Sequence, residues 1–78
     1  MKKGGLRMTD LKLKDEYIKL GQALKAAGLV SSGVEAKMVI QDGLVKVDGK
    51  VETRRGKKLF DGAVIEYDGS QVRVVASL

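Results

Sequence analysis

The chain has 78 residues, of which 44% are hydrophobic and 32% charged, with a formal net charge of +5 and neither histidine nor cysteine. A chain of this length forms one domain at most, around a modest core that leaves little room for a deep active-site cavity. Without histidine and cysteine, Ser-His-Asp and Cys-His catalysis, disulfides and thiolate metal sites are excluded. Asp and Glu could still hold a hard cation, but no EF-hand spacing appears, and nothing in the sequence suggests a lysine nucleophile. We therefore expect no enzyme activity, no cofactor and no metal site.

The start of the chain is strongly basic. Residues 1–14 hold five Lys or Arg side chains against Asp10, and they lack apolar periodicity. They also lack the apolar region of a secretory signal, and no run in the chain approaches the roughly 20 apolar residues that cross a bilayer. We therefore predict a flexible basic arm over residues 1–15, a folded domain over residues 16–78, a cytoplasmic location and no membrane partner.

A short helix is predicted next, after an extended piece around Tyr17 and Ile18. The segment LGQALKAAGL places Leu20 and Leu24, among other apolar residues, on one helical face. Lys25 falls on the opposite side, towards solvent. Gly28 suits the position just past a helix end, so the helix has about two turns.

A second helix is predicted in SSGVEAKMVIQDG. Ser32 and Glu35 have the spacing of a capping box, in which each side chain satisfies a backbone N–H at the helix start. Val39 and Ile40 belong to the inner face, and Gly43 ends the helix. Because only a few residues separate the two helices, we expect them to pack as a pair.

From residue 44 the hydrophobic period changes to two. Asp48-Gly49 and Asp68-Gly69 each lie between β-like flanks, which is typical of tight hairpin turns. Two further Asp-Gly pairs, at 42–43 and 61–62, fit a helix end and a corner. The predicted fold class is α+β, with two short packed helices followed by a small, mostly antiparallel sheet of three to four strands.

The loop VETRRGKKL, residues 51–59, concentrates positive charge. Four of the five positions from 54 to 58 are Arg or Lys, with Glu52 as the one nearby acid. Arg54 and Arg55 can grip phosphate oxygens bidentately, and the lysines act as point charges. A charge run is more often a solvated surface than a binding site. The density of like charges favours a polyanionic partner here, of which nucleic acid is the leading candidate.

The chain has few aromatic residues, and this limits the kinds of nucleic acid that we expect it to bind. The chain has Tyr17, Phe60 and Tyr67, and the last two fit core or strand positions. Binding of single-stranded bases normally needs exposed aromatic side chains. We therefore expect the chain to recognise phosphates and shape, in folded RNA.

The run LGQALKAAGLVSSGVEAKMVIQDGLVKVDGKV resembles the alpha-L RNA-binding motif, or S-four domain, and the continuation VETRRGKKL is similar to its small stand-alone bacterial members, the YbcJ-like group. The resemblance implies a helix pair on a small sheet, with RNA held between the basic edge of the helices and the adjoining β-loop. Two positions depart from the family pattern. Gly33 stands where many members have Arg, and Asp48 where many have Asn.

Together these observations predict a non-catalytic RNA-binding protein for structured RNA that acts as a monomer. The family resemblance alone implies that this RNA is ribosomal, with transfer RNA as the second choice. The alternative is a protein-interaction module that docks its basic loop on an acidic partner in a ribosome-assembly complex. The predicted RNA-binding residues are Lys25, Ser32, Lys37, Lys50, Arg54, Arg55, Lys57 and Lys58.

Overall fold

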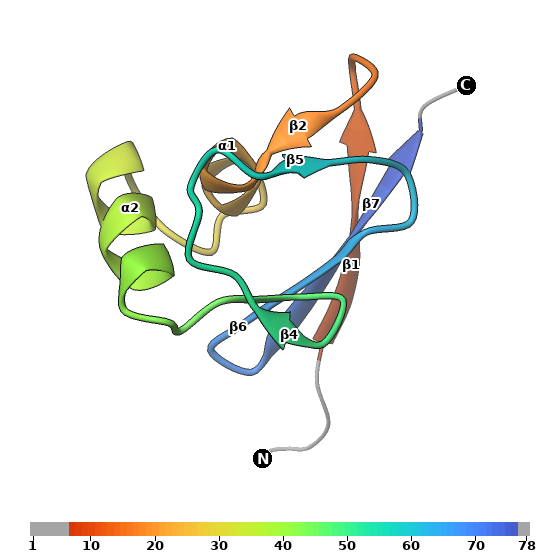
Figure 1. The fold of residues 1–78 in the computed structure, drawn as a ribbon. Helices are drawn as coiled ribbons and strands as arrows, with labels where there is room; N and C mark the ends of the chain where they lie inside the picture. The colour runs from red at the N-terminus through yellow and green to blue at the C-terminus, as the bar shows by residue number, and fades with distance from the viewer. Residues whose placement is uncertain (1–6, 77–78) are drawn as a thin grey trace.

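A computed structural model describes residues 7–76 as two helices beside a twisted sheet and a short ribbon (Figure 1). In chain order the elements are β1 (Arg7–Leu13), β2 (Ile18–Lys19), α1 (Leu20–Ala26), α2 (Gly33–Gln41), β3 (Lys46–Val47), β4 (Lys50–Val51), β5 (Lys58–Leu59), β6 (Val64–Tyr67) and β7 (Ser70–Ala76). Five strands form one sheet in the order β1-β7-β6-β3-β4, and β2 pairs with β5 in a separate ribbon. The α+β class and the mostly antiparallel pairing are confirmed. The predicted strand count was too low, because β1 and several two-residue strands gave little signal in the sequence.

The first strand corrects the prediction of a flexible arm over residues 1–15. Residues 7–13 form β1, which runs parallel to β7 with Arg7 opposite Ser70 and Leu13 opposite Ala76. Leu13 is buried in the core and Leu11 packs against it. Two alternating leucines are a weak strand signal, and the strand depends on a partner more than 60 residues away. The rest of the predicted arm up to residue 6 lies outside the described residues.

Both helices end as predicted, and the start of α2 differs in detail. Ser32 Oγ accepts a hydrogen bond of 3.1 Å from the N–H of Glu35, which is one half of the expected capping box. The other half is displaced by one residue, because Glu35 Oε1 accepts from the N–H and Oγ of Ser31 at 2.8 and 2.9 Å. These hydrogen bonds stabilise the carboxylate, with the bond from the backbone N–H of Ser31 the larger effect, and they hold the pKa of Glu35 below its usual value.

The two predicted hairpin turns are confirmed. Asp48 and Gly49 have φ angles of 52° and 84°, and Asp68 and Gly69 have 52° and 78°. Two consecutive positive φ angles define the type I′ turn, whose twist matches that of the flanking strands. Asp48 Oδ1 also accepts a hydrogen bond of 3.0 Å from the N–H of Val64, which ties this turn to β6.

The core lies between the helix pair and the sheet, and it is made of apolar side chains from every layer. Its fully enclosed members include Leu20 and Leu24 of α1, Ile40 of α2 and Ile65 of β6. Neither helix in residues 7–76 is long and apolar enough to cross a membrane. The same residues contain no group of three or more acidic side chains placed to hold a metal ion.

Candidate functional site

The basic loop is fixed to the start of α1 by its own backbone. The carbonyl oxygens of Lys57 and Arg55 accept hydrogen bonds from the N–H groups of Leu20 and Gly21, at 2.9 and 3.0 Å. Within the described chain no side chain caps this helix start, so the loop carbonyls satisfy N–H groups that a helix leaves unpaired. The prediction that the loop lies beside the helix pair is confirmed, and the loop is held there by the fold.

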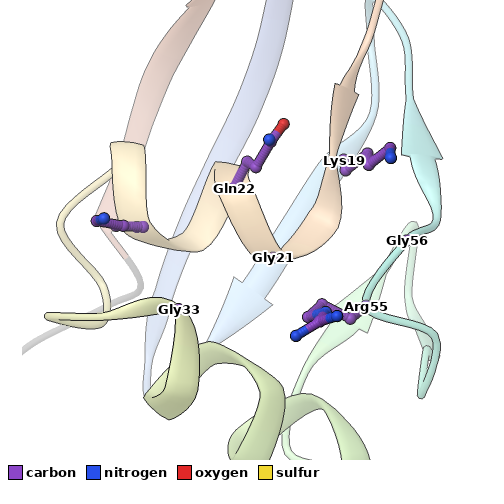
Figure 2. Close-up of a pocket in the computed structure, with 7 residues that line it drawn as sticks. Lys19, Gly21, Gln22, Gly33, Arg55 and Gly56 are labelled. Carbon is purple, nitrogen blue, oxygen red and sulfur yellow. The ribbon is translucent and has the colours of Figure 1, made fainter.

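An open concavity of about 360 Å³ lies where the loop meets the two helices (Figure 2). We call it the helix–loop groove; its lining residues are Lys19, Gly21, Gln22, Lys25, Gly33, Arg55 and Gly56. Three of these seven described residues are basic and none is acidic. Like charges in one concavity repel one another and raise the local concentration of anions, so the groove is suited to a phosphate.

The two neighbouring arginines of the loop have different surroundings. Arg54 forms an ion pair with Glu52, with Nε 2.9 Å from Oε2 and Nη2 3.3 Å from Oε1. The paired guanidinium lowers the pKa of Glu52, and the carboxylate raises that of Arg54. Arg55 instead lines the helix–loop groove. The Arg54 side chain is 72% exposed but that of Glu52 only 14%, so Arg54 must leave a largely covered carboxylate to meet a phosphate, while Arg55 needs no such exchange.

The two lysines of the loop lie away from the groove. Lys57 lines a second open depression together with Lys50 and Asp48. The Nζ atom of Lys58 lies 4.8 Å from the centre of the Tyr17 ring, a cation–π contact. The sequence suggested that the basic residues at 54–58 form a single phosphate-binding cluster. In the structure these residues instead lie in different surroundings.

Two further predicted residues, Ser32 and Lys37, lie at the start and in the middle of α2, outside the groove lining. Ser32 directly precedes Gly33, and its Oγ is occupied by the helix cap. The Glu35 carboxylate held on Ser31 adds negative charge at this helix start, which disfavours a phosphate there. Lys37 is exposed one turn after Gly33, on the same side of α2. Of the eight predicted residues, the groove brings together Lys25 and Arg55.

Sequence reasoning missed Lys19 and Gln22 of the groove lining. A signal was present, because Lys19, Gln22 and Lys25 follow one another at intervals of three residues. At this spacing Gln22 and Lys25 lie on neighbouring parts of the α1 surface, while Lys19 precedes the helix with an extended backbone. The polar side of α1 and the neighbouring loop could be predicted, but the side chains that line the groove between them could not.

Comparisons with known proteins agree with this architecture. The S4 domain family matches residues 11–75. YbcJ of Escherichia coli (strain K12) is 43% identical over 63 residues, which cover 81% of this chain and 90% of the relative. A Bacillus subtilis (strain 168) protein named "Probable ribosome maturation protein RlbA" is 39% identical over 59 residues, covering 76% of this chain and 83% of the relative.

A solved structure extends the similarity to nearly the whole chain. The solution structure of E. coli YbcJ, described as revealing an alfaL motif involved in RNA-binding, superposes with a TM-score of 0.65 at 37% identity. The match covers 97% of this chain and 95% of that one. The resemblance seen in the residues is confirmed, and the chain belongs to the S4 domain family.

Proposed function

We propose that this chain is a non-catalytic, cytoplasmic RNA-binding protein that acts as a monomer and grips structured RNA, ribosomal rather than transfer RNA, by its phosphates. The observation that carries the proposal is the helix–loop groove, where Lys19, Lys25 and Arg55 converge without an acidic neighbour in the lining. The RNA-binding motif described for YbcJ and the ribosome maturation named for RlbA support it.

The groove residues contact phosphate first. Arg55 offers a planar fork of donors that matches two phosphate oxygens, and Lys25 approaches from α1. Arg54, Lys57, Lys58 and Lys50 lie around the loop and the β3–β4 hairpin, where they extend the contact along the RNA backbone. Lys37 and the helix start at Ser32 border the site on α2. Each cation that meets a phosphate releases counterions, so affinity falls as salt rises.

A protein-interaction module is the second candidate, and exposed apolar side chains favour it. Val34 and Met38 lie one turn apart on α2 with 70% and 59% of their surface exposed, and Leu44 and Val51 are 56% and 54% exposed. Neighbouring exposed apolar residues, such as Val34 and Met38 at this spacing, are typical of partner surfaces. In this alternative the basic loop docks on an acidic protein of a ribosome-assembly complex.

The test is anisotropy of a labelled ribosomal RNA hairpin, titrated at several salt concentrations with wild type and with a variant carrying Gln at positions 54, 55, 57 and 58. If all four side chains contact phosphate, the log–log salt slope flattens by about 3.6 units, 0.9 for each lost contact. Far-UV circular dichroism establishes that the variant is folded. Failure of wild type to bind any folded RNA would overturn the proposal and favour the protein partner.

A further inference from the structure

The outer face of the β2–β5 ribbon combines two aromatic and two basic side chains. The strands are antiparallel with Ile18 opposite Leu59 and Lys19 opposite Lys58. Side chains alternate along a strand. Because Leu59 is buried and Ile18 packs against the core, Lys19 and Lys58 share the opposite, exposed face.

The aromatic pair continues the same face one residue beyond each strand. The ring centres of Tyr17 and Phe60 are 5.8 Å apart with an interplanar angle of 51°, and Lys58 lies over the Tyr17 ring. We call Tyr17, Lys19, Lys58 and Phe60 the ribbon face. The expectation that Phe60 fits a core or strand position was wrong: it follows β5 and is 49% exposed.

Two features of this face are unfavourable without a ligand, beside the favourable contacts of the Tyr17 ring with Phe60 and Lys58. A half-exposed phenylalanine ring leaves apolar surface in water, and lysines directly opposite each other on paired strands repel. A bound nucleotide would offset both effects. Its base presents a flat π-face that covers the exposed aromatic ring, and its negatively charged phosphate reduces the repulsion between the two lysines. Tyr17 supports the Phe60 ring from one side, which leaves the exposed part of that ring for a base.

The ribbon face is continuous with the helix–loop groove. Lys19 lines the groove, and on the ribbon it stands directly opposite Lys58. Lys58 precedes Phe60 by two residues on the same face. An RNA strand that leaves a phosphate in the groove therefore meets Lys58 and then the aromatic pair.

We infer that the ribbon face is a stacking site for an unpaired nucleotide that flanks the structured RNA held in the groove. The base stacks on Phe60, and its phosphate lies between Lys19 and Lys58. This inference rests on the proposed function and narrows its ligand. The preferred RNA is a stem with a single-stranded extension or bulge next to it, and a fully paired stem occupies the groove alone.

The test uses three RNA hairpins with one common stem: a blunt hairpin and two that carry a short unpaired extension at the 5′ or the 3′ end. The fluorescent base 2-aminopurine is placed in each extension. The proteins are wild type, Phe60→Leu, which keeps apolar bulk but removes the aromatic face, and Phe60→Trp, which keeps a stacking surface. Thermal unfolding establishes that each variant is folded.

Wild type is expected to bind one extended hairpin about tenfold more tightly than the blunt one and to change its 2-aminopurine fluorescence. Phe60→Leu loses the tenfold preference but binds the blunt hairpin like wild type, and Phe60→Trp retains the preference. Equal binding of all three hairpins by wild type, or an unchanged preference in Phe60→Leu, would overturn the stacking site and leave the groove intact. Binding to no hairpin would overturn the proposed function itself.

Discussion

The N–H of Gly21 donates a hydrogen bond of 3.0 Å to the carbonyl oxygen of Arg55, and a Cβ atom at Gly21 would lie 2.6 Å from Arg55 Cγ. The basic loop thus approaches position 21 of α1 so closely that a side chain there fits only if the Arg55 side chain shifts. The absence of a side chain at Gly21 therefore allows Arg55, a proposed phosphate-binding residue, to occupy its position in the groove. A change at Gly21 therefore acts on binding through Arg55.

Gly21→Ala is expected to weaken RNA binding about tenfold, the effect of losing one hydrogen bond to a charged group. The added methyl group displaces the Arg55 side chain from the groove. Stability changes by less than about 1 kcal/mol, because the gain in helix propensity opposes the steric conflict. Anisotropy measures the first effect and urea unfolding the second.

Gly33→Ala is the matched control for Gly21→Ala. Gly33 also lies in a helix and lines the groove, but a Cβ atom there meets nothing within 4 Å. Its RNA affinity should equal that of wild type. Equal losses of RNA affinity in the two variants would show that Gly21 does not act through the position of the Arg55 side chain.

Gly33→Arg should strengthen binding. The position opens onto the groove without steric conflict, and an arginine there adds a cation beside Lys25 and Arg55. We expect the log–log salt slope to steepen by about 0.9, as for one added phosphate contact. The positive charge at the start of α2 costs about 0.5 kcal/mol of stability. If the affinity rises but the salt slope does not change, the new arginine does not contact a phosphate.

Asp48 stabilises its turn in two ways, through its backbone conformation and through a side-chain hydrogen bond. It adopts a φ of 52°, and its Oδ1 accepts from the N–H of Val64. Asp48→Ala loses the hydrogen bond and strains the turn, for a loss of about 2 kcal/mol in the free energy of unfolding. Asp48→Asn keeps the acceptor and tolerates positive φ, so it should lie within about 0.5 kcal/mol of wild type. Comparable losses in both variants by urea unfolding would refute this account.

Acid should destabilise the protein in part through Glu35. Its pKa in the folded chain is lowered from 4.5, so its contribution to stability is complete above that pH and is lost as the pH falls through the lower folded value. Glu35→Gln removes the charge that titrates, and Ser31→Ala removes one donor. Both variants should lose less stability than wild type between about pH 5 and pH 3 in urea unfolding. Parallel pH profiles for all three proteins would contradict this role.

Features that depend on a few neighbouring residues were predictable. The ends of both helices follow from Gly28 and Gly43, and the hairpins from Asp48-Gly49 and Asp68-Gly69. Each of these signals acts on the backbone within one turn of the chain, so a local pattern suffices.

Features that depend on distant packing were not predictable. β1 needs β7 as its partner, and the ribbon face exists because β2 meets β5 some 40 residues later. The separation of Arg54 from Arg55 likewise depends on the contact of the loop with α1. The family resemblance indicated the helix pair and the loop, and the structure adds Lys19 and Gln22 to the groove.

The measurement that tests the account most directly is the salt dependence of binding to the blunt RNA hairpin by two charge-matched double variants. One carries Lys25→Gln and Arg55→Gln in the groove, and the other carries Lys12→Gln and Lys46→Gln on exposed strand positions. We predict that the groove variant lowers the log–log slope by about 1.8 units, as for two lost phosphate contacts, while the strand variant keeps the wild-type slope. Equal slopes in the two variants would contradict the helix–loop groove as the phosphate-binding site.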